Sequence, residues 1–236
     1  MFPLPLLIVA ACGTSDPEGE ILQPEPSTDS PSPAIAVADP PAPVTPTFEA
    51  RSAPLTEAFR LRMQGRSHHE GCPVALDALR AVELTHWTPS GAVEKGTLVL
   101  HADHVDVAVN AFRLAFEARF PITSMRPVHA FDGDDGASMR ADNTSAYNCR
   151  RVKGTNTYSE HSYGRAIDVN PLRNPWVRGD RVDPPEGSAH AIRDPLRPGM
   201  LGADSALVKA FEAAGWGWGG RWSSLKDYQH FSATGR

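Results

Sequence analysis

The sequence lacks the features that would indicate a membrane-spanning or nucleic-acid-binding protein. No apolar run reaches the roughly 18 residues that a membrane-spanning helix requires, and the apolar run at residues 1–11 is far too short. There is also no run of lysine or arginine, and the formal net charge of −5 gives no reason to expect a nucleic acid partner. Cysteine is scarce, with three in 236 residues. Apolar residues are ample from about residue 55 onward, so one folded domain of moderate size is expected there.

The N-terminal segment has the character of an export signal. The apolar residues 1–11 are followed by a cysteine, and Val9-Ala10-Ala11-Cys12 resembles the cleavage box of bacterial lipoproteins. No lysine or arginine precedes the apolar run, which departs from the usual signal. We therefore expect a lipoprotein-type signal peptide at 1–11 and a lipid on Cys12, with a frayed apolar N-terminus as the alternative.

A tether is expected after the signal. Residues 12–54 are rich in proline, serine, threonine, alanine and acidic residues, a composition that cannot bury enough apolar surface to order itself. This segment is predicted to be a disordered link between a lipid anchor and a folded domain at 55–236, or alternatively a generic disordered tail. The protein would then be extracytoplasmic and attached to the bacterial cell envelope, or secreted.

The two remaining cysteines form an even pair. Cys72 and Cys149 are predicted to be joined by a disulfide if the chain enters an oxidising compartment, with two buried thiols as the alternative. Closing so long a loop would stabilise the fold by roughly 4 kcal/mol on the chain-entropy account.

Hydrophobic spacing predicts an α+β fold. We expect a single compact domain with a small, mainly antiparallel sheet flanked by helices, because strands and helices are interspersed without a regular repeat. The expected helices are 73–84, 104–119 and 204–214, the expected strands are 96–101, 120–125, 165–170 and one around His230, and the expected loops are 129–150 and 171–202.

Two short segments carry side chains suited to a catalytic zinc site. His161 and Asp168 flank Gly164, which would let the chain turn and bring both side chains to one point. Asp227 and His230 are three residues apart near the C-terminus, so a turn would place them on one side. A catalytic zinc site needs three nitrogen or oxygen ligands, an open position and a nearby carboxylate. Taken singly, each histidine or carboxylate is more often structural.

The wider pattern resembles the D-alanyl-D-alanine carboxypeptidase family of zinc peptidases, closest to its branch of L-alanyl-D-glutamate endopeptidases and endolysins. The likeness covers roughly residues 70–232, in blocks that follow the family's order. These blocks are Ser159-x-His161-x-x-Gly164-x-Ala166-x-Asp168 with Asn170-Pro171, Gly215-Trp216-x-Trp218-Gly219-Gly220-x-Trp222, and Asp227-x-x-His230-Phe231. The resemblance implies one Zn²⁺ per chain, lying on the sheet face and held by His161, Asp168 and His230, with Asp227 as the general base.

The family also uses an arginine ahead of the first zinc motif to bind the substrate carbonyl. Arg126 best matches that position and Arg150 is the rival. Ser159, Arg150 and Trp218 are further candidates for substrate binding, although glycine-spaced tryptophans can equally pack beside a site.

The resemblance implies a zinc-dependent hydrolase that cuts a peptide bond in peptidoglycan. It would be a monomer of the D,D-carboxypeptidase or L-Ala-D-Glu endopeptidase type, acting on stem peptides. The alternative is a non-catalytic, zinc-stabilised cell-wall-binding module on a surface lipoprotein. An intact Asp227 beside intact ligands favours the enzyme, because a retired enzyme has no chemical need of its base.

Overall fold

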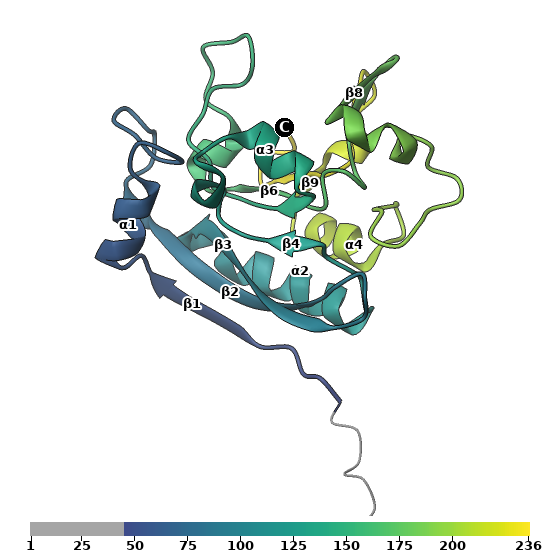
Figure 1. The fold of residues 1–236 in the computed structure, drawn as a ribbon, viewed down its shortest axis with the longest axis horizontal. Helices are drawn as coiled ribbons and strands as arrows, with labels where there is room; N and C mark the ends of the chain where they lie inside the picture. Colours follow the sequence, from purple (N-terminus) through teal and green to yellow (C-terminus); the bar gives the residue numbers. More distant parts are fainter. Residues whose placement is uncertain (1–44) are drawn as a thin grey trace, which may run out of the picture. The chain divides into compact units, whose positions relative to one another are not determined.

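The computed structural model describes residues 45–236 (Figure 1). The expected signal peptide, Cys12 and the tether up to residue 44 lie outside the described residues. The helices are α1 (Glu57–Met63), α2 (Val105–Glu117), α3 (Asp135–Arg140) and α4 (Ala206–Ala213). The strands are β1 (Ala50–Pro54), β2 (Leu79–Trp87), β3 (Val93–His101), β4 (Ser124–Met125), β5 (Asn143–Thr144), β6 (Ala166–Asp168), β7 (Trp176–Arg178), β8 (Arg181–Asp183), β9 (Gly217–Trp218), β10 (Lys226–Asp227) and β11 (His230–Ser232). This arrangement confirms the α+β class.

The strands are divided among small sheets. The largest is antiparallel with the order β1-β2-β3, and two further antiparallel sheets have the orders β10-β7-β8 and β6-β11-β9. Strands β4 and β5 pair in parallel. None of the helices in the described part of the chain is long and apolar enough to cross a membrane.

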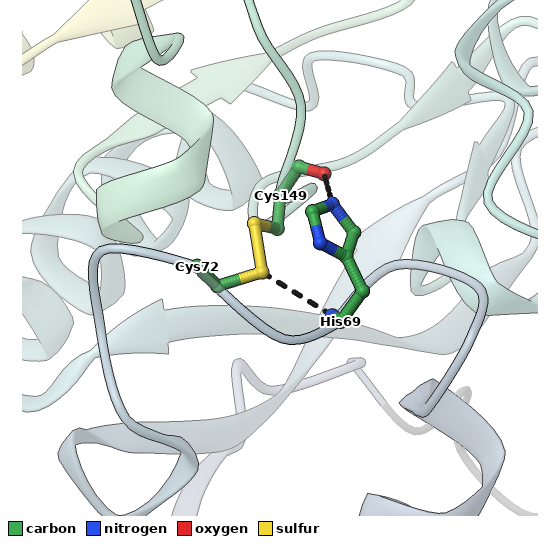
Figure 2. A group of neighbouring side chains, drawn as sticks. All are labelled: His69, Cys72 and Cys149. Atoms are coloured by element: carbon green, nitrogen blue, oxygen red, sulfur yellow. Dashed lines mark hydrogen bonds between the residues drawn. A yellow bond between two sulfur atoms is a disulfide. The ribbon is translucent and has the colours of Figure 1, made fainter.

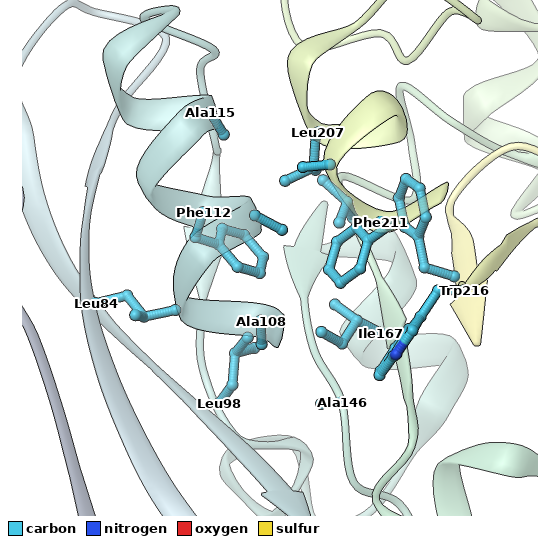
Figure 3. Close-up of a cluster of buried hydrophobic side chains, with 14 of the residues drawn as sticks. Leu84, Leu98, Ala108, Phe112, Ala115, Ala146, Ile167, Leu207, Phe211 and Trp216 are labelled. Atoms are coloured by element: carbon cyan, nitrogen blue, oxygen red, sulfur yellow. The ribbon is translucent and has the colours of Figure 1, made fainter. Parts of the chain in front are cut away.

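The main hydrophobic core lies between the β1-β2-β3 sheet and strands β6 and β11. Helix α2 packs against β2 and α4, and its Phe112 side chain points toward Phe211 of α4, on the side away from Leu84 (Figure 3). The Phe112 and Phe211 rings meet edge to face with their centroids 6.4 Å apart. Burying each such ring contributes roughly 2–3 kcal/mol relative to leaving it exposed.

The same core orients the strands that carry the chemistry. Ile167 of β6 and Phe231 of β11 are cross-strand partners, both fully buried, and the Phe231 ring lies 4.6 Å from that of Phe211. Because successive side chains of a strand point to opposite faces, the neighbours Asp168 and His230 are directed away from the core. Packing of β6 and β11 therefore fixes both polar residues on one face.

Several sequence predictions agree with the structure. The expected helices at 104–119 and 204–214 are α2 and α4, and the expected strands at 96–101 and 165–170 lie within β3 and around β6. Strand β11 begins at His230, as expected. At 120–125 only the last two residues form a strand, because β4 pairs with nothing longer than the two-residue β5.

The predicted helix at 73–84 is wrong. A single 3₁₀ turn at Leu76–Ala78 is followed by β2, which pairs on both edges with β1 and β3. Leu76, Leu79 and Val82 have the three-residue spacing that predicts a helix, whereas the buried Val82 and Leu84 alternate as in a strand. Pairing with β1 and β3 selects the strand.

Three other segments differ in secondary structure from what the sequence predicts. The expected loop at 129–150 contains α3 and β5, and that at 171–202 contains the β7–β8 hairpin and a 3₁₀ turn at Pro185–His190. Residues 50–54, which the sequence placed in the tether, form β1. All five β1 side chains are exposed, so the strand has no hydrophobic pattern by which the sequence could reveal it.

Candidate metal centre

His161 stands on a short turn that the local sequence builds. It lies in the 3₁₀ turn Glu160–Tyr163, where the Ser159 hydroxyl accepts a hydrogen bond from the His161 main-chain N–H at 3.4 Å. Gly164 ends the turn in the left-handed conformation (φ 66°). A Cβ at Gly164 would lie 2.6 Å from the main-chain nitrogen of His101, so glycine is required there for space as well as conformation. The chain can then enter β6 toward Asp168.

Asp168 and His230 face each other across two strands. They are cross-strand partners in the antiparallel β6–β11 pair. His230 Nδ1 lies 2.9 Å from Asp168 Oδ1, and His161 Nε2 lies 3.1 Å from Asp168 Oδ2. The two ring nitrogens are 3.3 Å apart. One ligand atom from each of these three residues therefore converges on a single point, within 4.8 Å of one another.

The outer nitrogen of each imidazole has a main-chain partner. His161 Nδ1 donates to the carbonyl oxygen of Ala146 at 2.6 Å, and His230 Nε2 donates to the main-chain oxygen of Arg236 at 2.9 Å. Histidine ligands commonly donate their other N–H in this way, which fixes the tautomer and the ring orientation. The inner nitrogens are thereby directed toward the Asp168 carboxylate.

The three side chains are buried, which makes their charges interdependent. His161, Asp168 and His230 are 3%, 7% and 7% exposed. Burial alone would raise the pKa of Asp168, but the charge and hydrogen bonds of the two histidines outweigh it and bring that pKa well below its usual range. For His230, burial would lower the pKa, but the hydrogen bond and negative charge of Asp168 raise it to about 9. Two imidazoles and a carboxylate gathered in this way are a donor set that suits a divalent cation such as zinc.

Asp227 is held beside this cluster on β10. Its Oδ1 is buried and has no hydrogen-bond partner. Burial, reinforced by the negative charge of Asp168 and opposed by the positive charge of His230, raises the pKa of Asp227 to about 6. The strand is fixed by pairing with Trp176 of β7, and a Cβ at Gly219 would lie 2.4 Å from the Asp227 carbonyl oxygen. A half-buried carboxylate with a pKa near neutrality and an unpaired oxygen has the properties of a general base.

A second group of possible ligands contains His69, Cys72 and Cys149. Figure 2 shows that the two sulfurs are bonded to each other, which confirms the predicted disulfide. The Cα atoms of the two cysteines are 5.9 Å apart. His69 Nε2 lies 3.1 Å from the Cys149 carbonyl oxygen instead of facing a free thiolate. With both sulfurs committed to the disulfide, this group offers no metal site.

The remaining predicted site residues lie in different settings. Arg126 is exposed, and its guanidinium lies 5.0 Å from the Phe131 ring centre. Arg150 is half-buried, forms a 2.8 Å ion pair with Asp135, and has an Nε without a partner. The Arg150 main-chain nitrogen donates to Ser162 on the His161 turn, so Arg150 is tied directly to that turn.

Trp218 and Ser159 are structural in their observed contacts. Trp218 is 5% exposed and its indole N–H donates to the Tyr228 carbonyl oxygen at 2.9 Å. Ser159 is buried and caps the turn of His161. A substrate-binding role for either residue stays a prediction.

The sequence did not predict the hydrogen-bond partners of the outer nitrogens of His161 and His230. Ala146 and Arg236 contribute main-chain oxygens, which every residue type possesses, so no sequence signal could have found them. Gln229 was also missed: it is 3% exposed and its side-chain oxygen lacks a partner. Its position between Asp227 and His230 in the sequence could have pointed to it.

The described domain therefore combines a buried His-Asp-His cluster that could hold a metal ion with an adjacent carboxylate that could move protons. Residues 153–233 match the family model described as D-alanyl-D-alanine carboxypeptidase. The match includes every residue of the cluster and Asp227, covers about a third of the chain, and supports a peptidase. Comparison with curated proteins and with solved structures found no match.

Proposed function

We propose that this protein is a zinc-dependent peptidase that hydrolyses a peptide bond in peptidoglycan, of the D,D-carboxypeptidase or L-Ala-D-Glu endopeptidase type. The observation that carries the proposal is the convergence of His161, Asp168 and His230 inside the segment that matches the peptidase family. Two imidazoles and one carboxylate would hold the metal and leave a coordination position open. Bound zinc would supply a cation that polarises the scissile carbonyl and acidifies water.

Asp227 is assigned the proton transfers. Its buried, unpaired Oδ1 would take a proton from the attacking water and return it to the departing amine, so that one peptide bond and one water become a carboxylate and an amine. A pKa of about 6 leaves the carboxylate ionised at neutral pH and yet basic enough to accept a proton. Asp227 can therefore both accept the proton from water and donate it to the departing amine.

Arg126 is proposed to stabilise the developing oxyanion. Its guanidinium is exposed and makes no ion pair among the described residues, whereas that of Arg150 is committed to Asp135. Replacing Arg126 by alanine should lower kcat by about 100-fold or more, as loss of one oxyanion donor does elsewhere. An equal loss only in Arg150→Ala would transfer the role to Arg150.

The decisive experiment combines metal analysis with product identification. Purified protein should contain close to one zinc per chain, and digestion of stem peptides should release products that mass spectrometry can assign. Released D-alanine would indicate a carboxypeptidase, and a break between L-Ala and D-Glu would indicate an endopeptidase. Asp227→Ala should stop product release while zinc remains bound. Peptidoglycan binding without any cleavage by the wild-type protein would instead support a zinc-stabilised binding module.

The location is proposed from the N-terminal sequence. A lipid on Cys12 and a tether would hold a monomeric peptidase domain at the cell envelope, where peptidoglycan lies. Cys12→Ser should move the protein from the membrane fraction to the soluble fraction without changing its activity. Membrane association that persists in this variant would argue against the lipid anchor.

A further inference from the structure

The turn at residues 232–236, which we name the C-terminal turn, folds back onto His230. Gly235 has φ 75°, a left-handed conformation that reverses the chain direction. The main-chain oxygen of Arg236 then accepts two hydrogen bonds, from the Ser232 hydroxyl at 2.7 Å and from His230 Nε2 at 2.9 Å. The residues of the C-terminal turn therefore provide the outer partner of a candidate metal ligand.

The C-terminal turn is held in place by a neighbouring segment. The Trp222 indole N–H donates to the Gly235 carbonyl oxygen at 2.9 Å, and the Trp222 ring lies 5.7 Å from that of His230. A Cβ at Gly217 would lie 2.4 Å from the Gly235 Cα, so the two backbones are in direct contact. Gly217 itself pairs with Ser232 in the β9–β11 ladder. The C-terminal turn is therefore held by Trp222 through a hydrogen bond and by Gly217 through backbone contact.

The position of the proton on an imidazole decides which nitrogen can bind a metal. When Nε2 donates to an oxygen, its proton is retained and the lone pair of a neutral ring lies on Nδ1. In His230, Nδ1 is the nitrogen that faces Asp168 and His161. We infer that the C-terminal turn positions His230 for metal binding, by holding the proton on Nε2 and the ring in line with the other two ligands.

This inference rests on the proposed function. Zinc binding by the wild-type protein tests the proposed function, and the zinc affinity of the variants relative to the wild type tests the role of the C-terminal turn. Gly235→Val should disrupt the turn, because a β-branched residue rarely adopts φ 75°. Gly154→Val is the matched control, because Gly154 has φ 78° and no atom within 4 Å of its Cβ position, while the nearest atom at Gly235 is the Gly217 Cα at 3.9 Å. Trp222→Phe removes the indole donor and retains a ring beside His230.

Zinc affinity should be measured by competition with a chromogenic chelator, on variants whose folding has been checked by circular dichroism. We expect Gly235→Val to weaken zinc binding by roughly 10- to 100-fold, as removal of an outer partner does at other zinc sites. Trp222→Phe should cause a smaller loss in the same direction, and Gly154→Val should bind like the wild type. If Gly235→Val does not fold, the Trp222→Phe result decides.

The nitrogen-15 NMR spectrum of the zinc-loaded protein provides a second readout. His230 should keep its proton on Nε2 and show the Nδ1 shift of a coordinated nitrogen. Wild-type affinity in both Gly235→Val and Trp222→Phe would overturn the role of the turn and leave the proposed peptidase intact. A wild-type protein that binds no zinc would overturn the proposed function, and this inference with it.

Discussion

At the scale of single residues, Asp227 is half-buried, and its carboxylate oxygen Oδ1 is fully buried without a hydrogen-bond partner. Its pKa is raised from 3.8 to about 6 by burial and by Asp168, so its contribution to stability is complete below pH 3.8 and is lost as the pH rises through about 6. Asp227→Asn should therefore stabilise the metal-free protein at pH 7.5, by about 1–3 kcal/mol. Urea unfolding would measure the gain, with the exposed Asp180→Asn as the control. An equal free energy of unfolding in the Asp227→Asn and Asp180→Asn variants would contradict the prediction that the ionised Asp227 carboxylate destabilises the metal-free protein.

His230 should make both stability and metal binding depend on pH. Its pKa is raised from 6.5 to about 9 in the folded protein, chiefly through Asp168 against the opposing effect of burial. The resulting stabilisation of the metal-free protein is complete below pH 6.5 and is lost as the pH rises through about 9. Zinc must displace a proton from His230 below pH 9, so zinc affinity should rise across that interval.

The measurement is zinc titration and urea unfolding at several pH values between 6.5 and 9. Unfolding of the metal-free wild type should become easier toward pH 9, while zinc binding becomes tighter. His230→Gln should weaken zinc binding and flatten the pH dependence of unfolding. A pH-independent zinc affinity in the wild type would rule out a displaced proton.

Residues that supply reactive side chains were the predictable part of the site. His161, Asp168, Asp227 and His230 could be found because their side-chain chemistry is distinctive and their spacing recurs. The outer partners at Ala146 and Arg236 could not, because a carbonyl oxygen depends on the path of the chain and is independent of residue type.

At the scale of elements, the turn between His161 and β6 depends on Gly164. Gly164→Ala should lower the free energy of unfolding by more than about 1 kcal/mol, because alanine is strained at φ 66° and its Cβ would collide with the backbone of His101. Thermal unfolding would measure the loss. Gly91→Ala is a suitable control, since Gly91 has φ 82° but no atom within 4 Å of its Cβ position. Equal losses in the two variants would mean that the close approach contributes nothing.

Element types were predictable where one periodicity dominated. The spacing of Val105, Val109, Phe112 and Phe116 predicts helix α2, and all of these residues except the partly buried Val109 are buried in the structure. The apolar residues of β2 match a helix and a strand alike, and pairing with β1 and β3 selects the strand. Short strands such as β4 and β10 are defined by their partners, so their own residues carry little information.

At the scale of the whole molecule, the Cys72–Cys149 disulfide connects segments 77 residues apart. Replacing both cysteines by alanine should lower the free energy of unfolding by about 4 kcal/mol, because the unfolded chain regains the freedom of a long loop. Chemical denaturation would measure the loss, and reduction of the wild type with dithiothreitol should reproduce most of it. Wild-type protein whose unfolding is unchanged by the reductant would show that the bond adds no stability.

The cross-strand pairing of Asp168 with His230 also has a consequence for timing. The candidate metal centre takes one of its three residues from β11, the last strand of the described chain, and that strand pairs with both β6 and β9. A chain whose synthesis has not yet reached β11 contains His161 and Asp168 but lacks His230, the third residue of the cluster. The candidate metal centre is therefore complete only when β11 has joined the fold.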